Sequence, residues 1–300
     1  MTAAVDAVMR ALFAPGLLAS GPVRTAAAVG GGAAVVCAIV GVFTVLRGEA
    51  FAGHALADVS SAGGSLSFLL GASPLLGFLG MSALAAAGLE AAGVRRAQGR
   101  DLATGVVLGA GLGLAALFLY FDATRTSAGG AAVAVMFGSM FAIPASTAPV
   151  AAAVGLVALG ATAWLYRPLL LSSVSPDLAA ARGVRLGATS LAHAVVLALA
   201  VALAAVTVGA ILATALLVGP AATGIRLARR PAGAFAAAAG IGLGATWAGI
   251  GLAYDSAGWT PAHPWPVSFF VVALIMAVHL AVRGRAGRPA PALPGDGGEG

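Results

Sequence analysis

The chain has 300 residues, of which 60% are hydrophobic and only 9% charged, whereas soluble domains carry roughly 25% charged residues. Its mean hydropathy of +1.02 indicates an integral membrane protein. The formal net charge of +6 comes from sixteen arginines, and the sequence contains no lysine. A G-x-x-x-x-G-K-[ST] phosphate loop needs a lysine, so the chain is not itself an ATPase of that class. The arginines lie in short loops between apolar segments, which favours membrane orientation over nucleic-acid binding.

The N-terminal region, residues 1–24, is predicted to lie at the membrane interface, because Pro15 interrupts its short apolar run. A transmembrane domain then extends over 25–283, starting with a clean span at 25–46. Cys37 is the only cysteine, so neither an intrachain disulfide nor a cysteine-based metal cage can form. We interpret it as a small packing residue in this first span.

The charge-free run from Val59 to Leu89 is too long for one helix, and the "GASP" stretch at 71–74 divides it into two. Further spans are predicted at 103–121, 148–166, 187–206, 208–226, 232–254 and 266–283. The sequence thus predicts an all-α polytopic membrane protein with about nine spans. The stretch 131–144 has only about 14 apolar residues and is expected to re-enter or to lie at the interface rather than to cross. The tail, 284–300, is rich in Pro and Gly and is expected to be disordered.

With 131–144 not crossing, the predicted loops on one side hold thirteen of the sixteen arginines. The positive-inside rule places that side in the cytoplasm. One of its loops contains "SVSPDLAAARGVR", which has the start and stop residues of a short helix. Ser175 is a good N-cap, Pro176 suits the first helical position, Asp177 the first turn, and Gly183 the stop. Such a helix on the inner face could dock a partner or could be an ordinary loop helix.

His54 and Asp58 are the strongest candidates for a functional pair, because ionisable residues inside a bilayer are costly. At i and i+4 of a helix, an imidazole nitrogen and a carboxylate oxygen can converge on one cation. Imidazole suits Zn, Mn or Fe, and two ligands hold an ion weakly enough to release it. The alternative is a mutually satisfied pair that stabilises the start of the helix.

Four other residues are weaker pathway candidates. His193 lies inside a predicted span and could face the bundle interior. Asp255 and His263 flank a loop that is predicted to be external, and Asp122 is placed in another external loop. These loop residues could receive a cation, although solvated side chains are the ordinary alternative.

Several stretches together resemble the zinc/manganese permease family of bacterial ABC importers. "GHALADVSSAG" aligns with that family's G-D-x-x-S-H-x-x-x-P-G stretch, "MFGSMFAI" with L-F-G-S-I-L, and "SPDLAAARGV" with D-P-E-L-A-R-A-L-G-V. "VGAILATALLVGPAATGIRLAR" matches a V-G-x-L-L-V-x-A-L-L-V-x-P-A-A-T-A run closely. The landmarks follow the family's order from about residue 40 to 283.

The resemblance implies a type II ABC-importer-like permease in the bacterial plasma (inner) membrane that forms a homodimer. Its implied partners are separate ATPase subunits, an extracytoplasmic metal-binding protein and membrane lipid. Residues 175–183, with Leu178 and Arg182 among them, would be the coupling helix that enters a cleft on the ATPase. The family's pathway Asp and His match positions 54 and 58, but their order is reversed here, and Ala57 and Ala62 replace Ser and Pro.

We therefore expect a permease, not an enzyme, that imports zinc, manganese or iron and holds the transported Zn²⁺ or Mn²⁺ only transiently, with no resident cofactor. A permease for iron chelates would instead need a wide pathway without an ionisable pair. An ion-coupled carrier or channel would need no ATPase, and the coupling-loop match opposes it. A membrane enzyme would need a catalytic constellation, which the sequence does not show.

Overall fold

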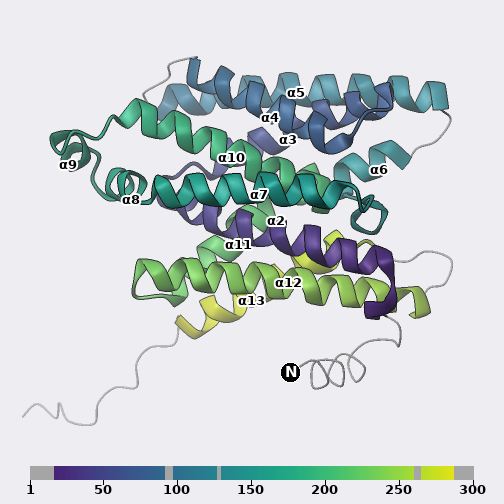
Figure 1. Ribbon diagram of the computed structural model, residues 1–300. Coiled ribbons are helices and arrows are strands. Elements are labelled where there is room, and N and C mark those ends of the chain that lie inside the picture. The colour runs from purple at the N-terminus through teal and green to yellow at the C-terminus, as the bar shows by residue number, and fades with distance from the viewer. Residues whose placement is uncertain (1–16, 92–96, 127–129, 260–264, 287–300) are drawn as a thin grey trace, which may run out of the picture.

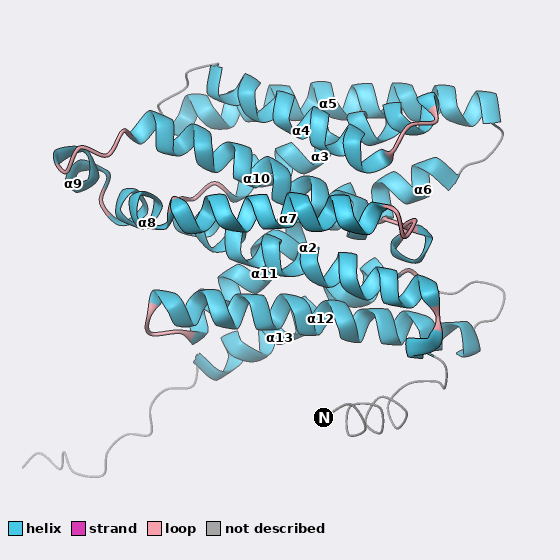
Figure 2. Cartoon of the chain, in the orientation of Figure 1, coloured by secondary structure: helices cyan, strands magenta, loops and turns pink. Residues whose placement is uncertain are grey.

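A computed structural model of the chain describes residues 17–91, 97–126, 130–259 and 265–286, and the structural statements below concern these ranges. Within them the chain is helical and forms no strand, as Figure 2 shows. The prediction of an all-α membrane protein is confirmed. Its principal helices are α2 (Gly21–Leu46), α3 (Ala50–Leu70), α4 (Pro74–Ala91), α5 (Ala97–Thr126), α7 (Thr147–Trp164), α10 (Leu186–Val208), α11 (Ala210–Leu227), α12 (Pro231–Trp259) and α13 (Val267–Ala286).

Shorter elements lie at the two ends of this bundle. The long helices run roughly along one common direction, and α8 (Tyr166–Val174) and α9 (Pro176–Ala181) lie at one end, where α9 projects beyond the others (Figure 1). The short helix α6 (Gly130–Phe137) and the 3-10 turns η1 (Leu17–Ala19) and η2 (Met140–Ala142) belong to the opposite half. The two ends of the bundle therefore carry different short elements.

Helices α2 and α10 form the centre of the bundle. In the most apolar window of α2, 72% of the residues are buried, whereas the figure for α5 is 17%. Helix α2 packs against α7, α10, α11 and α12, while α5 packs mainly on α3. A helix that is apolar on all sides can be buried in protein or face lipid. Here α2 is buried within the bundle, whereas most of α5 is exposed on its outside.

Glycines form the turn and the close backbone contact in the hairpin of α3 and α4. Gly71 ends α3 in the left-handed region, with φ of +66°, and Pro74 opens α4, so the predicted division at "GASP" is confirmed. Between the two helices, a Cβ added to Gly63 would lie 2.1 Å from the carbonyl oxygen of Gly77. The backbones touch directly, which only residues without a side chain permit.

Seven of the described helices are both long and apolar enough to cross a bilayer, namely α2, α5, α7, α10, α11, α12 and α13. Helix α3 is not among them, because it carries His54, Asp58 and four serines. The apolar part of α4, Pro74–Gly88, is short. The predicted count of nine is therefore not confirmed by length and hydropathy.

Helix α6 has only eight residues and spans about 12 Å, less than half of the roughly 30 Å hydrocarbon core. It is too short to cross alone, in agreement with the non-spanning segment predicted there. Its end meets the break between α10 and α11 at two glycines with positive φ, Gly138 at +74° and Gly209 at +87°. A Cβ on Gly209 would lie 2.3 Å from the carbonyl oxygen of Met136, so this contact also requires glycine.

The predicted domain limits differ slightly from the structure. Helix α2 begins at Gly21, four residues earlier than expected, since Pro22 is favourable in a first helical turn. Helix α13 continues to Ala286, so the predicted tail starts inside a helix. The remainder of the predicted interfacial segment (1–16) and tail (287–300) lies outside the described residues.

Candidate metal pathway site

His54 and Asp58 lie on the second and third turns of α3, in one helix as predicted. The imidazole Nε2 is 3.4 Å from Asp58 Oδ2. The His54 side chain is 40% exposed, whereas that of Asp58 is 9% exposed. The carboxylate thus lies in the protein, and the imidazole forms the accessible side of the pair. An ion could approach the histidine first and then reach the buried oxygen.

A third side chain comes from α11. Thr214 Oγ1 is 2.9 Å from His54 Nδ1. With a cation between Nε2 and Asp58, the Nε2 lone pair would bind the cation, and the Nδ1–H would donate to the Thr214 hydroxyl. This contact between residues 160 positions apart fixes the ring orientation, as partners of metal-binding histidines commonly do. Sequence analysis did not single out Thr214.

The separation of the two candidate ligand atoms suits a shared cation. Nitrogen and carboxylate oxygen bind zinc at about 2.0–2.2 Å. A cation at those distances from two atoms 3.4 Å apart subtends an angle of roughly 100–115° at the metal. That angle is close to tetrahedral, so His54 Nε2 and Asp58 Oδ2 could bind one ion with little movement.

The hydroxyl groups of the serines next to the pair donate their hydrogen bonds to backbone carbonyls of the same helix. Ser60 Oγ donates to the carbonyl oxygen of Ala57, and Ser61 Oγ to that of Asp58. Ser65 Oγ donates to the carbonyl oxygen of Ser61. Such back-bonding to the preceding turn is how serine is accommodated inside an apolar helix. We therefore assign no ligand role to these hydroxyls.

Within the described ranges, no group of three His, Cys, Asp or Glu side chains could hold a metal ion. His193 is buried on α10, where its Nε2 lies 3.5 Å from Glu49 Oε2. Asp122 and Asp255 were expected in external loops, but both lie inside helices, α5 and α12, and Asp122 is buried. Each helix continues past the end of the span predicted from hydropathy, because a single acidic residue does not end a helix. His263 lies outside the described residues.

The predicted short helix is present as α9. Ser175 is its N-cap and accepts a hydrogen bond from the Leu178 backbone N–H at 3.4 Å. Pro176 and Asp177 occupy the first turn, and Arg182 is the C-cap. Gly183 has φ of +80° and closes the helix.

The surface of α9 is open on almost every side. Leu178 is 45% exposed, and of the helix's own residues only Ala179 is buried. The preceding Val174 is exposed as well. Apolar side chains on a projecting helix are suited to insertion into a complementary cleft.

The comparisons agree with this architecture. The model of the ABC 3 transport family matches residues 22–281. The manganese transport system membrane protein MntC of Halalkalibacterium halodurans is 29% identical over 219 residues, which cover 72% of this chain and 73% of that protein. The manganese import system permease protein ScaB of Streptococcus pneumoniae is 30% identical over 237 residues, or 77% and 80% of the two chains.

Solved structures share the fold. PsaBC from Streptococcus pneumoniae, solved in complex with Fab, aligns with a TM-score of 0.75 at 23% identity, covering 89% of this chain and 92% of that one. A proposed metal-chelate type ABC transporter in an inward-facing conformation aligns with a TM-score of 0.66 at 17% identity, covering 87% and 84%.

The apolar helices and the family match together define a multi-pass permease of the bacterial inner membrane. The chain belongs to the ABC 3 transport family. The family resemblance predicted from its sequence motifs is thereby confirmed.

Proposed function

We propose that the chain is the permease subunit of an ATP-driven importer for a divalent transition metal, with manganese the first candidate. The observation that carries the proposal is the pairing of His54 and Asp58 on α3, oriented by Thr214 of α11. The manganese systems named for its relatives support the choice of metal. A bare cation suits this pair better than an iron chelate, which would need a wide path.

The projecting helix α9 supports an ATP-driven mechanism. An ion-coupled carrier or channel would work without an ATPase, so it does not account for the match of this helix to the family's coupling loop. We propose that α9 docks in a cleft on a separate ATPase subunit and that α3 and α4 also cross the membrane, giving nine spans. The end with α9 would then be cytoplasmic, in agreement with the predicted distribution of arginines.

We further propose that two copies of the chain pair around the pathway and receive the cation from an extracytoplasmic metal-binding protein. The support is the exposure of His54 in the single chain. An ionisable side chain that faced lipid in the bilayer would be costly. A second copy of the chain would remove that side chain from lipid and enclose the path.

The test is uptake of radioactive manganese into proteoliposomes that contain the chain with its ATPase. We expect His54→Ala and Asp58→Asn each to reduce uptake by about 10-fold or more. Loss of a residue that only supports a metal ligand typically costs about 10- to 100-fold in metal affinity or activity, and these two residues are the candidate ligands themselves. Ser60→Ala is the matched control on the same helix and should transport normally. Normal uptake by both pair variants would contradict the assignment of the site.

A further inference from the structure

A second polar cluster lies at the α9 end of the bundle, where α2 connects to α3. The connection is the three residues Arg47, Gly48 and Glu49. The Gly48 N–H bonds the carbonyl oxygen of Val45 at 3.1 Å, and the Glu49 N–H bonds that of Thr44 at 2.8 Å. This pair of bonds is the Schellman arrangement, with Gly48 in the left-handed region at φ of +68°. The connection is therefore a firm joint between two helices.

The side chains of this joint reach both helices that flank α9. Arg47 Nε contacts Glu49 Oε1 at 3.0 Å. Its two terminal nitrogens donate to different elements, Nη1 to Ser172 Oγ of α8 at 3.1 Å and Nη2 to Ser190 Oγ of α10 at 3.4 Å. Glu49 Oε2 lies 3.5 Å from Nε2 of His193, also on α10. One guanidinium thus connects the segments immediately before and after α9 with the start of α3.

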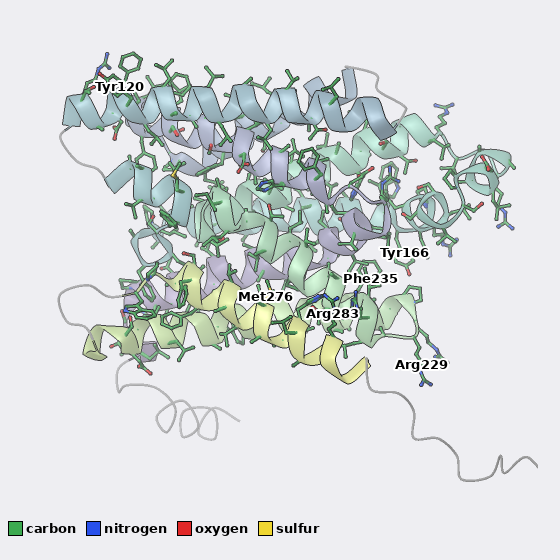
Figure 3. All side chains as sticks on the ribbon, turned by 180° about the vertical axis from the view of Figure 1, so that it is seen from behind. Tyr120, Tyr166, Arg229, Phe235, Met276 and Arg283 are labelled. Carbon is green, nitrogen blue, oxygen red and sulfur yellow. The ribbon has the colours of Figure 1, made fainter. Side chains whose placement is uncertain are left out.

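The cluster is protected from solvent. The side chains of Arg47 and Glu49 are 13% and 7% exposed. The Phe43 ring packs edge-on against His193 and Tyr166, and Phe43 and Tyr166 both contact Phe235. Figure 3 labels Tyr166 and Phe235 near the end of the bundle at which Arg229 lies. With little water to compete, these charge-assisted contacts hold their geometry better than a surface pair would.

The distance from this cluster to the metal pair is short. His54 follows Glu49 by five residues, which corresponds to about 7.5 Å along a helix. A helix transmits an axial shift at its first turn to the next turn with little loss. A displacement of α8 or α10 that moved Arg47 would therefore also move His54.

We propose that Arg47 and Glu49 are positioning residues that transmit movement of α9 to the metal pair on α3. Docking of the ATPase on α9 displaces α8 and α10, and the guanidinium carries that displacement through the 47–49 joint to α3. The proposal rests on the proposed function, since it assumes an ATPase on α9 and a cation on His54 and Asp58. It adds one specific polar connection between the two sites, beside the direct packing of α10 on α2 and α3.

The test compares cation transported with ATP hydrolysed in the reconstituted complex. In the double variant Ser172→Ala/Ser190→Ala, Arg47 keeps its ion pair with Glu49 but loses its hydrogen bonds to α8 and α10, while Glu49 keeps its contact with His193. We expect the ratio of manganese uptake to hydrolysis to fall by about 5-fold or more, the lower end of coupling between sites. Arg47→Ala should lower the ratio further, and the exposed Arg229→Ala is the matched arginine control.

A merely structural role would give a different result. Loss of folded complex lowers uptake and hydrolysis in proportion, so the ratio is unchanged, and that result would overturn the inference. Arg47→Ala leaves Glu49 without its cation and could fail to assemble; the serine variant, which keeps both charges, then decides. If the unaltered complex transports no manganese, zinc or iron, the proposed function itself fails. If it does and the serine variant keeps its ratio, only the transmission role is wrong.

Discussion

Replacement of Thr214 by valine tests the orientation of the metal pair with a minimal change in shape. Valine keeps the branched side chain but removes the hydroxyl that lies 2.9 Å from His54 Nδ1. A hydrogen bond of this kind contributes a net of about 0.5–1.5 kcal/mol. If that energy is lost only from the cation-bound state, cation affinity falls by about 2- to 13-fold.

The expected readout is therefore a rise of the same size in the KM for manganese uptake, with the maximal rate retained. Thr214→Ser keeps the hydroxyl and should behave like the unaltered protein. The assay is initial uptake into proteoliposomes over a range of manganese concentrations, with the amount of complex checked by quantitative gel. An unchanged KM in Thr214→Val would refute the view that this hydroxyl orients His54.

Two further predictions concern glycines. Gly183→Ala places a side chain at φ of +80° and should destabilise the end of α9 by about 1 kcal/mol, which would weaken ATPase binding about 5-fold in a pull-down titration. Gly187→Ala, where a Cβ meets nothing within 4 Å, should bind normally; equal binding by both variants would contradict the role of α9. Gly63→Ala forces a Cβ against Gly77 and should cost about 1–3 kcal/mol, lowering the thermal midpoint in detergent, whereas Gly80→Ala should not.

Features that depend on neighbouring residues could be predicted from the sequence. The turn that separates α3 from α4 requires a left-handed residue and a helix opener, and Gly71 and Pro74 supply them. The caps of α9 are equally local, since Ser175 acts on a backbone group three residues away. The i, i+4 spacing of His54 and Asp58 places them on one face of any helix.

Contacts between distant segments could not be predicted in this way. Thr214 is one polar residue in an apolar run, and nothing in that run indicates that α11 packs on α3 at His54. Arg47 and Ser172 are 125 positions apart, and they meet only because α2 and α8 end at the same side of the bundle. Hydropathy windows also ended the predicted spans at Asp122 and Asp255, although the backbone hydrogen bonds of each helix continue past them.

The small number of ligands on α3 bears on which metal is chosen. The affinity of a site with one imidazole nitrogen and one carboxylate oxygen follows the Irving–Williams order of divalent metals. In that order manganese binds more weakly than iron, zinc or copper. A pair of this kind cannot prefer manganese by affinity. In a manganese importer, discrimination would therefore rest on coordination geometry, on further ligands or on metal availability rather than on the affinity of this pair. The pair on α3 would then govern how readily a delivered ion is held and released, and would not by its affinity alone decide which metal is carried.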